Sequence, residues 1–113
     1  MLRVIIDIKD PEWLVLCEDY WQSVPAEVEQ LGRFLQSLFE RYDRHAYNEA
    51  YRIAHQISGT AGSYEMPRTT QEARRLEALL RQLKPDCIDD PVCAQVRDAY
   101  GRLQSTLDIL VAA

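Results

Sequence analysis

Hydrophobic side chains recur every three or four positions through most of the chain after residue 10, with polar side chains between them. This spacing places the hydrophobic side chains on one face of an α-helix. We therefore expect helices over about 11–22, 25–42, 46–64 and 70–83, and a last helix from residue 91 onward. The side chains expected to form core stripes in the second, fourth and last helices are Val28, Leu31, Leu35, Leu38 and Tyr42, then Ala73, Leu76, Leu80 and Leu83, and finally Val92, Val96, Ala99, Leu103, Leu107 and Leu110.

Prolines mark the expected boundaries between helices. Pro25 lacks a backbone N–H, so it predicts a break between a short leading helix and the second helix. Pro67 predicts a second break. The segment from Thr69 to Glu72 then has the spacing of a capping box, in which a hydroxyl and a carboxylate cap the start of a helix.

Residues 2–8 are rich in β-branched side chains, but no second strong strand is available to pair with them. We expect them to form an arm. The fold class that follows is all-α: an antiparallel up-down four-helix bundle with a short leading helix and an N-terminal arm. A length of 113 residues fits one domain, with the arm over 1–9 and the bundle over 10–113.

The charge distribution bears on the partners of the chain. The net charge is −5, from 13 basic and 18 acidic side chains, whereas a nucleic-acid groove needs a strong positive excess. Residues 44–84 are locally basic, with seven basic and four acidic side chains, and they contain both histidines. This segment could attract an acidic surface or a phosphoryl group. Ordinary surface variation is the alternative interpretation.

Three cysteines without a Cys-x-x-Cys pair indicate neither a disulfide framework nor a zinc site. No hydrophobic run is long enough to span a membrane, and no leader pattern is present. We therefore expect a cytoplasmic protein with no membrane contact and no metal ion of its own.

The third expected helix, over 46–64, contains the most informative face. At 100° per residue, its alanines and isoleucines fall on one side, which must be the core. His55 lies nearly opposite and should face solvent. Its helical neighbours are Asn48, Tyr51, Arg52 and the very small residues Ser58, Gly59 and Gly62.

Two glycines inside a helix cost about 1 kcal/mol each relative to alanine. One interpretation is that they leave His55 accessible, so that the backbone of another protein can approach the imidazole. The alternatives are that His55 is simply a solvated residue and that the glycines serve close helix packing.

Other side chains have simpler interpretations. His45 is ten residues from His55 and well off its face, so a shared metal site is not expected. The aromatic residues expected in the core or at helix seams are Trp13, Trp21, Phe34 and Phe39. Arg74 and Arg75 are expected on a solvated face, although one of them could approach the histidine.

The segment around His55 resembles the signature of histidine-containing phosphotransfer (HPt) domains. That signature reads roughly Ala-His-x-Leu-Lys-Gly-Ser-Ala-x-x-x-Gly, and residues 54–65 read Ala-His-Gln-Ile-Ser-Gly-Thr-Ala-Gly-Ser-Tyr-Glu. Leu76-Glu77 stands at about the distance at which the family has Leu-Glu. Asp43 resembles an acidic residue that these domains often carry between their second and third helices. The resemblance covers about residues 10–110.

The resemblance implies a phosphocarrier without kinase activity of its own. His55 would carry a phosphoryl group between aspartates of receiver domains, supported by Arg52, Gln56, Ser58, Gly59 and Gly62. The partner, a response-regulator receiver domain or a hybrid histidine kinase, would supply Mg²⁺. The chain itself would bind no cofactor and would be a monomer.

The chain departs from the family pattern at two positions. Ser58 stands where the family usually has Lys or Arg, and Glu65 stands where it has its closing glycine. An alternative function is therefore a transfer-impaired module that binds a receiver or regulator without accepting phosphate. A third possibility is a kinase-type dimerisation bundle, to which each chain donates two helices.

Overall fold

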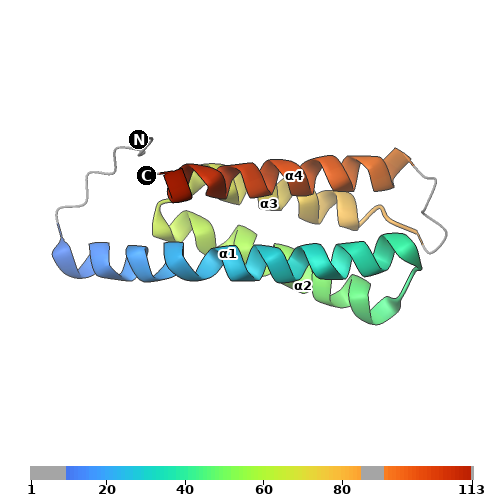
Figure 1. The fold of residues 1–113 in the computed structure, drawn as a ribbon, viewed down its shortest axis with the longest axis horizontal. Coiled ribbons are helices and arrows are strands. Elements are labelled where there is room, and N and C mark those ends of the chain that lie inside the picture. Colours follow the sequence, from blue (N-terminus) through green and yellow to red (C-terminus); the bar gives the residue numbers. More distant parts are fainter. Residues whose placement is uncertain (1–9, 85–90, 113) are drawn as a thin grey trace.

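A computed structural model describes the backbone over residues 10–84 and 91–112 and the side chains as far as Leu107. The described helices are α1 (Pro11–Glu40), α2 (Arg44–Thr60), the 3₁₀ helix η1 (Ala61–Tyr64), α3 (Pro67–Leu80) and α4 (Pro91–Ala112). α1 and α3 run in one direction and α2 and α4 run back (Figure 1). The prediction of an all-α, antiparallel up-down four-helix bundle is therefore confirmed. The expected arm over 1–9 and the loop after Lys84 lie outside the described residues.

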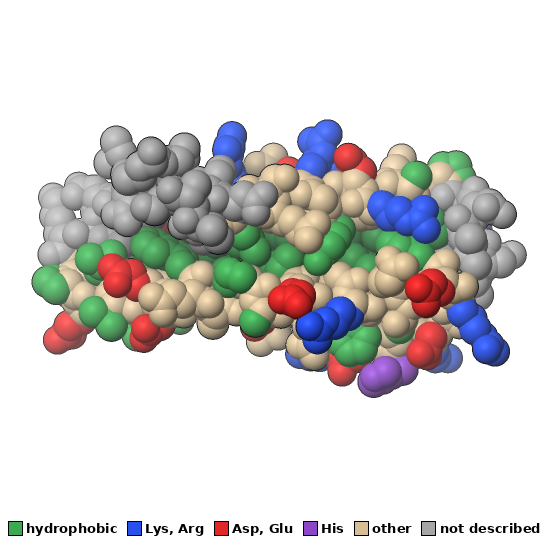
Figure 2. All heavy atoms as spheres, in the orientation of Figure 1, with side chains coloured by type: hydrophobic (Ala, Val, Ile, Leu, Met, Phe, Trp, Pro, Cys, Tyr) green, Lys and Arg blue, Asp and Glu red, His purple; other side chains and the backbone are tan. Residues whose placement is uncertain are grey.

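The helices pack in the order that short connections impose. α2 lies between α1 and α3, α3 packs against α4, and α4 returns to α1. Hydrophobic side chains gather along the seam between α1 and α4, with charged side chains on the outer sides (Figure 2). No helix in the described part of the chain is long and apolar enough to cross a membrane.

The core consists of the predicted stripes with small corrections. The stripe from Val28 to Leu38 is buried, but Tyr42 is only half-buried. In α4, Cys93 is buried where Val92 was expected, and Val92 packs at the edge of the core. Leu110 is among the residues whose side chains are not described.

The expected break at Pro25 is wrong, because α1 continues through this residue as one helix. Proline removes one helical hydrogen bond, but packing on both sides of it outweighs that loss. Val24 and Val28 are buried, and the Trp21 indole N–H donates to the Tyr64 carbonyl at 2.7 Å. The short leading helix is therefore the first part of α1.

The expected capping box is also wrong. α3 begins at Pro67, a favoured residue in the first helical turn, so the two threonines lie inside the helix and are buried. Thr70 Oγ1 donates to the Met66 carbonyl at 3.1 Å, and Thr69 Oγ1 lies 2.9 Å from Thr106 Oγ1 on α4. The Thr69 hydroxyl therefore joins α3 to α4, whereas the Thr70 hydroxyl bonds back to the start of its own helix.

α2 ends at Thr60, four residues before the predicted end, and the chain tightens into η1. The Tyr64 ring lies between Trp13, at 5.5 Å, and Tyr20, at 4.7 Å, in two stacked contacts with α1. Glu65 then adopts a left-handed backbone with φ 63° and ψ 38°, and its N–H bonds back to the Ala61 carbonyl. This is the position where the resembled family has glycine, the residue that takes this conformation at no steric cost.

We expect Glu65→Gly to stabilise the fold by about 1 kcal/mol, because it removes the steric cost of a left-handed side chain. Urea unfolding followed by circular dichroism measures this change. Glu65→Ala is the matched control, since it removes the carboxylate but keeps a Cβ atom. An equal gain in both variants would mean that charge, and not backbone conformation, disfavours Glu65.

Candidate functional site

α2 sets the position of His55. The helix begins at Asp43, whose carboxylate accepts from the His45 N–H at 2.9 Å and caps the first turn. The opposite face buries Ala50, Ile53 and similar side chains against the core. The imidazole of His55 therefore faces outward, and 68% of its side-chain surface is exposed.

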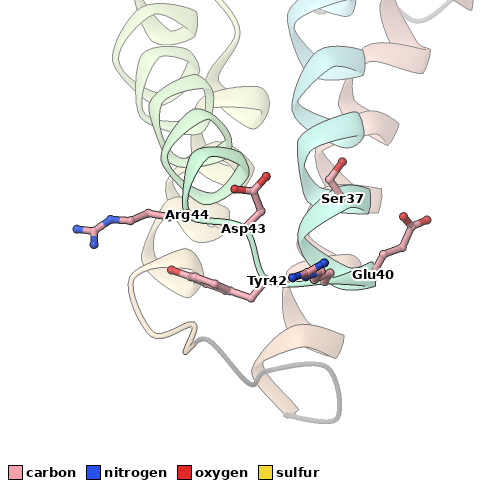
Figure 3. Close-up of a pocket in the computed structure, with 6 residues that line it drawn as sticks. Ser37, Glu40, Tyr42, Asp43 and Arg44 are labelled. Atoms are coloured by element: carbon pink, nitrogen blue, oxygen red, sulfur yellow. The ribbon is translucent and has the colours of Figure 1, made fainter.

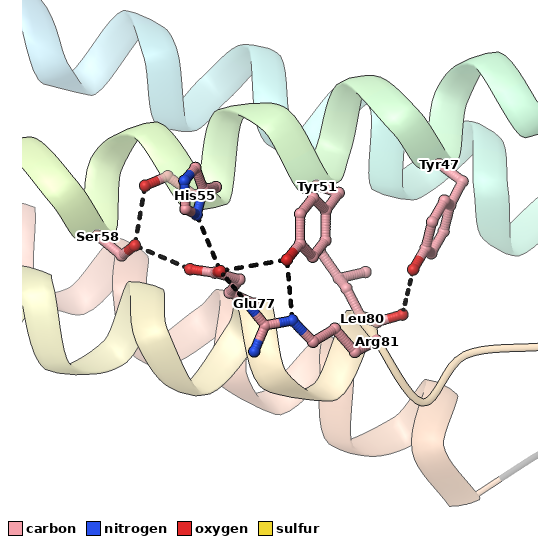
Figure 4. A network of polar contacts seen from close by, with 7 residues as sticks. All are labelled: Tyr47, Tyr51, His55, Ser58, Glu77, Leu80 and Arg81. Atoms are coloured by element: carbon pink, nitrogen blue, oxygen red, sulfur yellow. Dashed lines mark hydrogen bonds and ion pairs between the residues drawn. The ribbon is translucent and has the colours of Figure 1, made fainter.

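A carboxylate on the neighbouring helix fixes the ring of this exposed histidine. Glu77 of α3 is buried, with 9% of its side chain exposed, and its Oε2 lies 2.9 Å from His55 Nδ1 (Figure 4). An ionised carboxylate only accepts hydrogen bonds, so Nδ1 must carry a proton. The other ring nitrogen, Nε2, then has a free lone pair when the imidazole is neutral.

Glu77 is satisfied by further donors around it. Ser58 Oγ lies 2.8 Å from Oε1. Arg81 Nη2 donates to Oε2 at 2.8 Å, and the Tyr51 hydroxyl approaches Oε2 at 3.3 Å. A buried charge that is both paired and hydrogen-bonded avoids the large cost of an isolated one.

These contacts change the acidity of Glu77. Burial alone would raise the pKa of its carboxyl group, but hydrogen bonds from His55 and Ser58 and the nearby charges of His55 and Arg81 hold that pKa below its ordinary value. The side chain therefore remains a carboxylate throughout the neutral range.

Two tyrosines extend the site along α2. The Tyr51 ring stacks on the His55 ring, with 6.2 Å between centroids and 6° between planes, and Tyr47 stacks on Tyr51. The Tyr47 hydroxyl donates to the Leu80 carbonyl at 2.7 Å, and Arg81 Nε donates to the Tyr51 hydroxyl at 2.8 Å. Side chains spaced by four residues on α2 thus hold the C-terminal end of α3 (Figure 4).

The candidate residues from the sequence lie in different environments. Arg52 pairs with Glu49 at 2.6 Å and also contacts Gln56 at 3.3 Å, and no contact joins it to His55. Ser58 turns inward to Glu77 and is buried. The expectation that Ser58 lies with His55 on the solvent-facing side of the helix is therefore wrong.

The two glycines serve different purposes. A Cβ atom at Gly59 would meet nothing within 4 Å, so the surface beside His55 is open there. A Cβ atom at Gly62 would lie 3.2 Å from Thr70 Oγ1, and Gly62 belongs to η1 and not to α2. Gly59 therefore leaves His55 accessible, as the first interpretation holds, whereas Gly62 allows close helix packing, as the alternative holds.

Sequence reasoning did not single out Arg81. It placed Tyr51 beside His55 without giving it a role, and it noted Glu77 only as part of a motif. A signal for Glu77 was present: it stands on the same face of α3 as Ala73, Leu76 and Leu80, which are buried. A carboxylate in a core stripe is rare unless it has partners.

The remaining candidates lie away from His55. His45 is ten residues earlier, about 15 Å along the helix, and its ring meets the edge of Phe34 at 5.9 Å. Arg75 reaches Asp98 on α4 at 3.4 Å. Among the described residues, no cluster of three metal-ligating side chains occurs.

A recess lies at the link between α1 and α2 (Figure 3). Its lining does not include His55 or Glu77, and Asp43 within it already caps α2. The lining residues are Ser37, Glu40, Arg41, Tyr42, Asp43 and Arg44.

Comparison with known proteins gave one finding. The family model described as Hpt domain matches residues 15–106. This range includes all of α2 and α3 and the contacts around His55. No curated protein and no solved structure matches the chain.

We expect Glu77→Ala to lower the free energy of unfolding by about 1–2 kcal/mol near neutral pH, because Ser58 and Arg81 lose a charged acceptor. A carboxyl group whose pKa is lowered in the folded state stabilises the fold above its unfolded pKa, about 4.3, and loses this effect as the pH falls through the folded value. The difference between parent and variant should therefore shrink below about pH 4.

The matched control is Glu29→Ala. Glu29 also accepts from an arginine one turn away, at 2.8 Å, but both side chains are well exposed, so its loss should change stability by well under 1 kcal/mol. Urea unfolding at several pH values measures both effects. A difference between parent and Glu77→Ala that is independent of pH would contradict the role assigned to the carboxylate.

Proposed function

Since the chain belongs to the Hpt domain family, whose members take part in phosphotransfer of two-component systems, we propose that His55 is its phosphoacceptor. In this proposal Nε2 takes a phosphoryl group from the aspartyl phosphate of a receiver domain and returns it to another. The partner is a response-regulator receiver domain, free or within a hybrid histidine kinase. The chain acts as a monomeric cytoplasmic carrier.

The observation that carries the proposal is the contact between His55 Nδ1 and the buried Glu77 carboxylate at 2.9 Å. A carboxylate that accepts from one ring nitrogen fixes the tautomer and the orientation of the ring. It also makes the other nitrogen a better nucleophile, as in other histidine–carboxylate pairs. The exposure of the ring leaves Nε2 open to a partner.

In the proposed transfer step the phosphoryl group moves from an aspartate oxygen to the imidazole nitrogen. The Nε2 lone pair attacks phosphorus, an N–P bond forms, the P–O bond of the acyl phosphate breaks, and the aspartate leaves as a carboxylate. The Nδ1 proton stays in the hydrogen bond to Glu77, which stabilises the positive charge that develops on the ring. Phosphoryl transfer requires mainly alignment and charge neutralisation. We assign the magnesium ion to the acidic cluster of the receiver domain.

The surface beside His55 suits such a partner. Gly59 leaves open space next to the ring, so the backbone of another protein can come close. Arg52 and Gln56 are exposed on the same helix and contact each other, and they would form the rim of the docking surface. Gly62, which is not part of the family signature, supports this surface through its close packing against Thr70.

The transfer-impaired module remains the second candidate, because Ser58 is uncharged and buried. It would bind a receiver domain through the same surface without accepting phosphate. The kinase-type dimerisation bundle is disfavoured. Such a bundle takes two helices from each of two chains, whereas here a single chain supplies all four helices.

We expect the chain to take label from at least one of a panel of phosphorylated receiver domains with Mg²⁺ present, and the label should be acid-labile and base-stable. His55→Gln should abolish labelling. His45→Gln is the matched control and should label like the parent, because His45 has no contact with Glu77. Label retained on His55→Gln would contradict the proposal, and receiver binding without any label on the parent would favour the second candidate.

A further inference from the structure

We propose that Arg81 is a positioning residue that supplies the positive charge of the His55 site. This inference rests on the proposed function and deepens it. Arg81 balances the Glu77 carboxylate beneath the ring, so that a phosphoryl group can be carried on His55 next to that carboxylate. The charge therefore comes from α3, across the seam from the histidine.

The guanidinium group of Arg81 makes three contacts, two with Tyr51 and one with Glu77. Its Nε donates to the Tyr51 hydroxyl at 2.8 Å, and its Nη2 donates to Glu77 Oε2 at 2.8 Å. Its Cζ lies 5.7 Å from the centre of the Tyr51 ring. Arg81 is also the C-cap residue of α3, where the helix dipole favours a cation.

Arg81 and His55 share one acceptor atom. Both His55 Nδ1 and Arg81 Nη2 are within hydrogen-bonding distance of Glu77 Oε2, so the guanidinium and the imidazole are close neighbours. The Arg81 side chain is 61% exposed, and its Nη1 has no hydrogen-bond partner among the described residues. One amino group is thus available to an incoming anion.

The charges around Glu77 show why a cation is needed here. A phosphoryl group brings further negative charge to a ring that already lies against a carboxylate, and like charges repel at this range. Of the four described residues that donate to Glu77, Ser58 and Tyr51 are uncharged, and a neutral His55 carries no charge. Arg81 is the permanently charged donor. Arg52 is engaged by Glu49 and does not reach Glu77.

The test uses phosphoramidate, a small phosphoryl donor, so that no protein partner is needed. The Nε2 lone pair attacks its phosphorus, an N–P bond forms to His55, and the original N–P bond breaks as ammonia leaves. The rate of labelling of the full chain and the half-life of the phosphohistidine are measured for the parent and each variant. Circular dichroism confirms that each variant is folded.

We expect Arg81→Gln to lower the labelling rate or the phosphohistidine half-life about five-fold, the effect of losing one partly solvated charge contact. Arg81→Lys should restore at least half of this loss, because it retains the charge. Arg102→Gln is the matched control and should behave like the parent, because Arg102 is equally exposed and pairs with Asp98 on α4, away from His55. Tyr51→Phe keeps the stacked ring but removes an anchor of Arg81, so it should give an intermediate loss.

A lysine on α2 can replace the positive charge that is lost with Arg81. Ser58 Oγ lies 2.8 Å from Glu77 Oε1, so Ser58→Lys brings an ammonium group to the same carboxylate. Adding Ser58→Lys to Arg81→Gln should recover the lost rate, which a purely structural role of Arg81 would not explain.

The outcomes separate the two proposals. If the parent is labelled on His55 and Arg81→Gln matches it, the proposed function stands and the role of Arg81 is refuted. If Arg81→Gln is slow but neither Arg81→Lys nor Ser58→Lys recovers the rate, charge is not what Arg81 supplies. If the parent takes no label from phosphoramidate, both the proposed function and this inference are contradicted.

Discussion

The site depends on one buried carboxylate. Glu77 lies in the core stripe of α3, where an ionised group is tolerated only if it is paired and hydrogen-bonded. Its two oxygens meet this requirement through donors from α2 and from the end of α3. The same contacts that stabilise the charge also orient an exposed imidazole. The need to pair the buried Glu77 carboxylate therefore fixes the orientation of the exposed His55 side chain.

The rest of the fold keeps α2 and α3 in register for this contact. Near the N-terminal end of α3, Gly62 lets η1 approach Thr70 closely. At the C-terminal end of α3, the Tyr47 hydroxyl donates to the Leu80 carbonyl and the Tyr51 hydroxyl accepts from Arg81 Nε. An error of one helical residue would rotate a side chain by about 100° and separate the imidazole from the carboxylate. The polar contacts along the seam thus serve mainly to fix register.

Periodicity was sufficient to predict which segments are helical, most of the core stripes and the outward face of His55, because each depends on one helix alone. Contacts between helices could not be predicted in this way, since the pattern within a helix says nothing of its register against a neighbour. The role of Arg81 and the inward turn of Ser58 both depend on that register. The break expected at Pro25 was wrong because the local preference of proline was considered without the burial of Val24 and Val28 on either side of it.

The central claim is that Glu77 holds a proton on His55 Nδ1 and leaves Nε2 as the nucleophile. Nitrogen-15 NMR distinguishes the two tautomers of a neutral imidazole and measures this directly. We expect the Nδ1–H tautomer to predominate in the parent, and Glu77→Ala to shift the population toward Nε2–H. A parent chain that is mainly Nε2–H, or a tautomer population unaffected by Glu77→Ala, would contradict the claim.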